Sequence, residues 1–143
     1  MIMPPSHPGP GPIVIIVAED ESARRMLAAE VLTEAGYTVV EAARADDALA
    51  IIKSRAVDLL FTDVQMPGSM DGLELARYVR RHWPRVAVLI VSGHSNPAST
   101  ELPDGSRFLR KPYSTNQLLA DVRELAATGL AVHAGPRGEC TTW

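Results

Sequence analysis

Five short apolar stretches alternate along the chain with longer segments that have a helical pattern. Most of the stretches are near-continuously apolar, rich in β-branched residues and too short for helices, so they predict β-strands buried on both faces. The predicted strands span residues 13–18, 37–42, 57–62, 86–91 and 107–110.

Four segments carry apolar residues at spacings that place them on one face of a helix. The predicted helices span residues 22–35, 46–53, 71–83 and 114–128. Gly36 follows the first of them, as a left-handed residue at a helix C-terminus often does. Asp71 with Glu74, and Ser114 with Gln117, have the spacing of a capping box at a helix N-terminus.

Strands that alternate with helices predict a doubly wound α/β fold, because right-handed crossovers place helices on both faces of a parallel sheet. Five strands favour the flavodoxin-like order 2-1-3-4-5. The carboxyl ends of the first and third strands then lie side by side, at the edge of the sheet where ligands bind.

The composition predicts one folded domain. A chain of 143 residues that is 46% hydrophobic is long enough for one core and short for two. Residues 1–12 contain five prolines and two glycines and are expected to be disordered. Residues 13–128 form the predicted domain, and residues 129–143 lose the periodic pattern and predict a short tail.

Charge and cysteine content narrow the functional classes. The net charge of −3 argues against binding to nucleic acid. Cys140 is the single cysteine, so no intramolecular disulfide forms and a reducing, cytoplasmic setting fits. The longest apolar runs are about a third of a membrane span, and the start of the chain lacks the pattern of a signal peptide. A soluble protein with no membrane partner is expected.

Polar residues stand where four of the predicted strands end. Glu19 and Asp20 follow the first strand, and Asp63, Ser92 and Lys111 follow the third, fourth and fifth. Clustered carboxylates repel one another unless a cation neutralises them, and hard oxygen ligands favour Mg²⁺ or Mn²⁺. A metal ion, an ammonium group and a hydroxyl suit the transfer of a phosphoryl group onto a carboxylate.

Each of these residues also has an ordinary structural interpretation. Asp20 could cap the next helix, Ser92 could be a turn hydroxyl, and Lys111 could be a solvated charge. Asp63 is the hardest to explain in this way, because no predicted helix begins until Asp71. The coincidence of all four strand ends favours a functional site.

The same residues resemble the motifs of response-regulator receiver domains, in the same order along the chain. The matching segments are Glu19-Asp20-Glu21, DVQMPGSMDG at residues 63–72, Ser92-Gly93 and Lys111-Pro112. The resemblance implies that a histidine kinase or a histidine phosphotransfer protein phosphorylates Asp63 with the help of Mg²⁺. It further implies that Glu19, Asp20, Asp63 and the backbone carbonyl of Gln65 bind the metal, while Ser92 and Lys111 contact the phosphoryl oxygens.

Further roles follow from the same resemblance. Phe108 is either the aromatic switch residue of these domains or part of the core. Gln65 and His94 flank the path of the water that attacks the phosphorylated aspartate, although His94 is equally well explained as an exposed loop residue. The Lys111-Pro112 bond is a candidate cis peptide.

The sequence departs from the common receiver pattern in three places. Glu19 stands where an aspartate is usual, and Gly68-Ser69 adds one residue to the loop after Asp63. Residues 93–106, where receivers place their fourth helix, are poor in apolar residues and contain Pro97 and Pro103. A short or missing fourth helix is therefore expected, in a segment that becomes ordered on phosphorylation.

The sequence thus predicts a single-domain response regulator rather than an enzyme, one that promotes only its own phosphotransfer and dephosphorylation. No output module fits after Thr128, so output is expected through protein contact or phosphorelay. The alternative is a receiver-like interaction module that works without phosphorylation. A flavin carrier is disfavoured because Glu19-Asp20-Glu21 would repel its phosphate, and an aspartate-nucleophile phosphatase because Asp-x-Asp is missing at the first strand.

Overall fold

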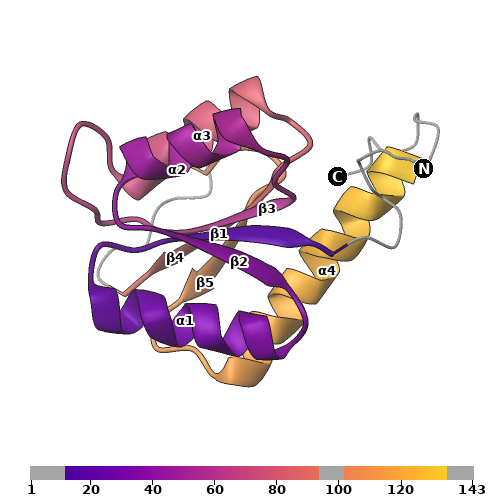
Figure 1. Cartoon of the computed structure of the whole chain (residues 1–143), viewed down its shortest axis with the longest axis horizontal. Helices are drawn as coiled ribbons and strands as arrows, with labels where there is room; N and C mark the ends of the chain where they lie inside the picture. The colour runs from indigo at the N-terminus through magenta and orange to yellow at the C-terminus, as the bar shows by residue number, and fades with distance from the viewer. Residues whose placement is uncertain (1–11, 94–101, 135–143) are drawn as a thin grey trace.

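The computed structural model describes residues 12–93 and 102–134, which form a five-stranded parallel sheet with helices on both faces (Figure 1). The strands are β1 (Val14–Ala18), β2 (Thr38–Ala42), β3 (Leu59–Asp63), β4 (Ala87–Ser92) and β5 (Arg107–Arg110). The helices are α1 (Ser22–Glu34), α2 (Ala45–Ser54), α3 (Gly72–His82) and α4 (Thr115–Ala134). The order β2-β1-β3-β4-β5, with every pair parallel, confirms the predicted doubly wound fold.

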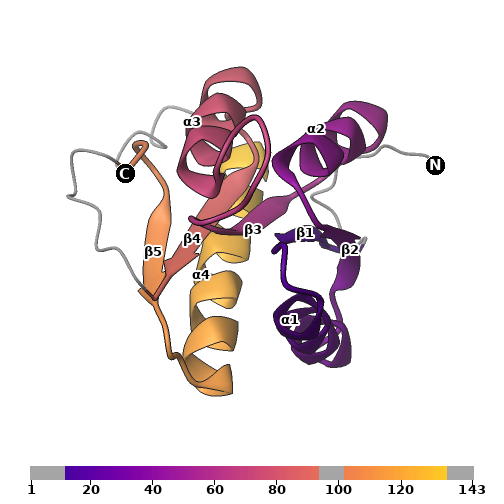
Figure 2. The same cartoon turned by 90° about the vertical axis from the view of Figure 1, so that its left-hand side faces the viewer.

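Two hydrophobic cores lie on opposite faces of the sheet. Ile16 of β1 packs in the core under α2 and α3, while its neighbours Ile15 and Val17 pack in the core under α1 and α4. Figure 2 shows the same two pairs of helices on the two sides of the sheet. β1 is buried along its whole length because both of its faces are covered, which explains its unbroken apolar sequence.

The two predicted capping boxes and the predicted left-handed glycine after α1 are confirmed. The side chain of Asp71 accepts a hydrogen bond from the backbone N–H of Glu74, the Glu74 side chain accepts one from the N–H of Asp71, and both distances are 2.9 Å. Ser114 and Gln117 make the equivalent pair before α4, at 3.0 and 2.9 Å. Gly36 has a φ of 105°, the left-handed backbone expected after α1.

The last helix is longer than predicted. The loss of periodicity after Thr128 predicts a helix end there, but α4 continues to Ala134. A single Gly129 costs a helix about 1 kcal/mol relative to alanine and does not by itself end it. The residues that follow, Leu-Ala-Val-His-Ala, contain no proline or second glycine to stop the helix.

The connection between β4 and β5 is described only in part. Residues 102–106 form a turn rather than a helix, in which the N–H and the hydroxyl of Ser106 donate to the carbonyl of Pro103 at 3.1 and 2.7 Å. The rest of the expected short fourth helix, residues 1–11 of the segment expected to be disordered, and most of the predicted tail lie outside the described residues.

Two further expectations concern the peptide bond before Pro112 and the lack of membrane-spanning helices. The Lys111-Pro112 peptide bond is cis, as predicted. Among the helices that the structure describes, none is long and apolar enough to cross a lipid bilayer.

Candidate functional site at the carboxyl edge of the sheet

The buried polar side chains of the described residues gather at one edge of the sheet. Glu19, Thr62, Asp63 and Ser92 are all at least 95% buried, and they stand at the carboxyl ends of β1, β3 and β4. The hydroxyl of Thr62 donates to the backbone carbonyl of Asp63. Burying carboxylates costs free energy unless partners compensate for it, so packing alone does not explain Glu19 and Asp63.

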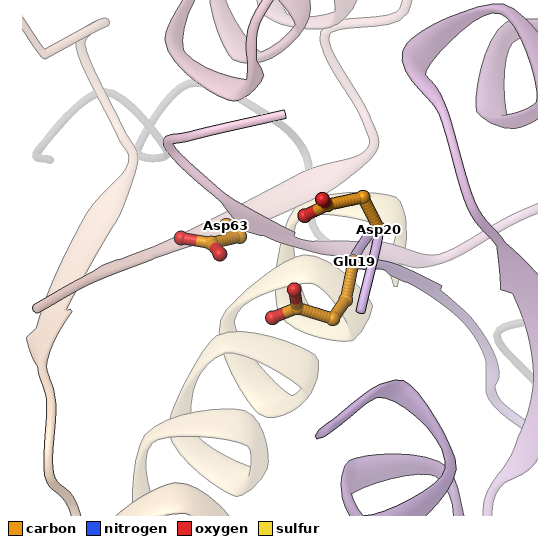
Figure 3. A group of neighbouring side chains, drawn as sticks. All are labelled: Glu19, Asp20 and Asp63. Atoms are coloured by element: carbon orange, nitrogen blue, oxygen red, sulfur yellow. The ribbon is translucent and has the colours of Figure 1, made fainter. Parts of the chain in front are cut away.

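Three carboxylates converge at this edge. Glu19 and Asp20 come from the connection between β1 and α1, and Asp63 is the last residue of β3. Figure 3 shows the three side chains gathered there, and each offers an oxygen within 4.8 Å of the others. A set of hard oxygen donors at this separation fits one divalent cation such as Mg²⁺ or Mn²⁺. The acidic residues predicted from the sequence are therefore brought together.

Lys111 places an ammonium group between two of these carboxylates. Its Nζ donates to Asp63 Oδ2 at 3.2 Å and lies 3.5 Å from Glu19 Oε1. The backbone N–H of Lys111 donates to the carbonyl of Ser92, which ties the end of β5 to the end of β4. One lysine therefore partly neutralises both buried acids.

Burial raises the pKa of Glu19 above its usual value, and repulsion from Asp63 acts in the same direction. The backbone N–H of Glu21, the Lys111 ammonium and the Arg24 guanidinium act in the opposite direction. The net rise means that ionised Glu19 is incompletely compensated by the protein itself. A cation bound beside it would supply the missing charge.

A cleft of about 620 Å³ opens over Asp63. It brings together five of the residues predicted from the sequence, Asp20, Asp63, Gln65, Ser92 and Lys111. A phosphoryl group that entered it would meet a carboxylate, an ammonium group and a hydroxyl.

For two other predicted residues, Phe108 and His94, the structure does not decide the role. Phe108 is half-buried and packs against the core under α2 and α3, so both its core role and its switch role stay open. His94 lies outside the described residues. The predicted roles of Gln65 and His94 in dephosphorylation stay predictions.

Two residues of the site were not found by sequence reasoning. Arg24 lines the cleft, and its Nε lies 3.5 Å from Glu19 Oε1. Gly72 packs so tightly against Asp63 that a Cβ on it would lie 1.6 Å from the Asp63 carbonyl oxygen. Arg24 stands within five residues of the acidic stretch and Gly72 directly after the Asp71 cap, but neither position alone indicates these contacts.

The family model of the response regulator receiver domain matches residues 15–123. Sensor kinase CckA of Brucella abortus is 38% identical over 120 residues, which are 80% of this chain and 13% of that protein. Nitrogen assimilation regulatory protein NtrX of Azorhizobium caulinodans is 37% identical over 109 residues, 73% of this chain and 24% of that protein. The chain thus spans a quarter or less of the length of these two relatives.

Two solved receiver structures share this fold. The receiver domain of NtrX from Brucella abortus superposes with a TM-score of 0.74 at 33% identity, over 80% of this chain and 98% of that one. A response regulator receiver protein from Sinorhizobium medicae superposes with a TM-score of 0.73 at 29% identity, over 82% and 97% of the two chains.

Proposed function

The chain belongs to the response regulator receiver domain family, and we propose that it accepts a phosphoryl group on Asp63 from a histidine kinase or a histidine phosphotransfer protein. The observation that carries this proposal is the position of Asp63, a buried carboxylate that lines an open cleft and contacts Lys111 at 3.2 Å. A buried acid facing a cleft is accessible to a reactant while its surroundings stay ordered.

In the proposed reaction, a carboxylate oxygen of Asp63 attacks the phosphorus of a phosphohistidine. The new P–O bond forms as the P–N bond breaks, and the imidazole leaves with the electron pair and takes up a proton. Lys111 and the Ser92 hydroxyl, both at the cleft, would donate hydrogen bonds to the phosphoryl oxygens. The product is an acyl phosphate on Asp63.

Glu19, Asp20, Asp63 and the backbone carbonyl of Gln65 would hold Mg²⁺, or Mn²⁺ in its place. When bound, the metal supplies positive charge to the phosphoryl oxygens and lowers the repulsion between them and the acidic cluster. The donor set supports this assignment, because its three side chains are all carboxylates within reach of one ion.

The surface beside the cleft suggests where the phosphodonor docks. Met26 and Leu27 of α1 are large apolar side chains that are 59% and 63% exposed. Leu27 also lines a second cleft of about 560 Å³, together with Tyr113 and Leu118, next to Arg24 and Lys111. Exposed apolar residues that border a reactive site favour contact with a partner protein. We therefore propose that the phosphodonor packs against α1 and the start of α4.

The proposed role is that of a switch and not of an enzyme with a separate substrate. The protein would promote its own phosphorylation and dephosphorylation, with Gln65 and His94 affecting the rate of the latter. Output is proposed to occur through protein contact or through transfer of the phosphoryl group to another protein.

The test is phosphorylation of the purified chain by acetyl phosphate with Mg²⁺, measured by intact-protein mass spectrometry. Wild type and Asp47→Asn, which changes an exposed carboxylate on α2, should be labelled, while Asp63→Asn should not. Excess EDTA should stop labelling of both wild type and Asp47→Asn. Full labelling of Asp63→Asn would refute the role of Asp63, and an unlabelled wild type would favour an interaction module that works without phosphorylation.

A further inference from the structure

Arg24 is a second cation at the acidic cluster. It stands in the first turn of α1, and its Nε lies 3.5 Å from Glu19 Oε1 and 3.9 Å from Glu21 Oε1. The Arg24 side chain is 55% exposed, whereas that of Glu19 is 4% exposed. Arg24 is therefore a largely exposed cation that pairs with a buried acid, and it lines the same cleft as Asp63.

Both oxygens of Glu19 are occupied by protein groups. Oε1 lies 3.5 Å from the Arg24 guanidinium and 3.5 Å from the Lys111 ammonium, and Oε2 accepts a hydrogen bond from the backbone N–H of Glu21 at 3.1 Å. A metal ion that binds Glu19 must therefore share or displace one of these partners. Lys111 is also bonded to Asp63, and the Glu21 N–H belongs to the backbone, so Arg24 is the partner that is displaced most easily.

Charge leads to the same conclusion. Three carboxylates, Glu19, Asp20 and Asp63, face two cations, Arg24 and Lys111, so the cluster has a formal charge of −1 (−3 + 2). Without Arg24 the charge would be −2, which attracts a divalent cation more strongly. The guanidinium thus opposes metal binding both by occupying an oxygen and by repulsion.

We propose that Arg24 is a positioning residue that competes with the divalent cation for Glu19 and so weakens metal binding. This inference rests on the proposed metal site. In the metal-free protein the Arg24 guanidinium pairs with Glu19 and holds its side chain in place. When the metal binds, the guanidinium moves into solvent.

The test is a calorimetric titration of the full chain with Mg²⁺, and of the variants Arg24→Gln, Arg24→Lys and Arg123→Gln. Arg123 is exposed on α4 and lines neither cleft, so its variant removes the same charge at a distance. Arg24→Gln should bind Mg²⁺ about two- to fivefold more tightly than wild type, as expected for loss of one exposed ion pair. Arg24→Lys and Arg123→Gln should stay close to wild type.

A second measurement tests whether the effect of Arg24 depends on its pairing with Glu19. In a Glu19→Gln background, Arg24→Gln should change Mg²⁺ affinity less than it does in the wild type, because the competition for Glu19 is gone and only the repulsion between the guanidinium and the metal remains. An unchanged or weaker affinity of Arg24→Gln, or equal tightening by Arg123→Gln, would overturn the competition while leaving the metal site intact. If none of the four proteins binds Mg²⁺, the proposed metal site and the competition both fail.

Discussion

At the scale of single residues, Gly72 packs the start of α3 against the backbone of the candidate site. Its N–H donates to the carbonyl of Val64 at 2.8 Å, and its Cα lies against the backbone of Asp63. A Cβ at this position would also come within 2.9 Å of the Thr62 hydroxyl. Only glycine lets α3 begin this close to the proposed phosphoacceptor.

Replacing Gly72 with alanine should therefore disturb both stability and the site. Gly72→Ala should lower the free energy of unfolding by about 1–3 kcal/mol, the usual cost of overpacking, and should slow phosphorylation by acetyl phosphate. Gly36→Ala is the control, because Gly36 has a left-handed φ but open space around it. It should lose about 1 kcal/mol and keep the wild-type rate. Urea unfolding and intact-mass kinetics measure both quantities, and equal rates for the two variants would contradict this role of Gly72.

Glu19 should make the metal-free protein less stable as pH rises. Its pKa is raised in the folded state by burial and by Asp63, so the folded protein holds a proton that the unfolded chain has already lost. The stability from Glu19 is therefore fully present below the unfolded pKa of 4.5 and is lost as pH rises through the higher folded pKa. Glu19→Gln removes this titration.

Urea unfolding in EDTA between about pH 4 and pH 7 measures the effect, since this range covers the titration of carboxylates. Wild type should lose stability relative to Glu19→Gln as pH increases. Parallel stability curves for the two proteins would show that the pKa of Glu19 is not raised.

At the scale of elements, α1 combines site residues with an apolar surface. Its first turn carries Arg24, and the next turn exposes Met26 and Leu27 beside the second cleft. A protein donor would contact this surface, whereas acetyl phosphate is too small to need it. Comparing phosphorylation by a protein donor with phosphorylation by acetyl phosphate therefore distinguishes an effect on docking from an effect on the reaction itself.

Leu27→Ala should slow phosphotransfer from a histidine kinase that phosphorylates the wild type, by about tenfold for a loss of roughly 1.4 kcal/mol of contact. Labelling by acetyl phosphate should be unchanged, and stability nearly so because the side chain is mostly exposed. Glu30→Ala, at another exposed position of α1, is the control. Equal slowing with both donors would place the effect of Leu27 in the site rather than in docking.

At the scale of the whole molecule, the acidic cluster exists only when β1 and β3 are paired, so metal binding should stabilise the fold. A ligand that binds only the folded state adds about 1.4 kcal/mol at ten times its Kd. Mg²⁺ should therefore raise the Tm by a few degrees, compared with EDTA at the same ionic strength. Asp20→Asn, which removes one carboxylate of the cluster, should reduce this rise. An equal rise in both proteins would indicate nonspecific binding and would contradict the metal site.

The sequence by itself determined the architecture and the main residues of the candidate site. Apolar stretches alternating with helical patterns have one common parallel arrangement, so the sheet order and the edge that collects Glu19, Asp63 and Lys111 followed from local patterns. Helix ends at Asp71 and Ser114 were also predictable, because a capping box involves residues only three positions apart.

Only the tertiary structure decided which residues of different elements and loops come into contact. It placed Gly72 against the carbonyl of Asp63, and it directed Arg80 of α3 to donate to the carbonyl of Asp104 at 3.0 Å, which joins α3 to the turn before β5. It also brought Arg24 and Lys111 to the same oxygen of Glu19. These contacts depend on side-chain direction and on the distance between packed elements, and neither is encoded in the spacing of residues along the chain.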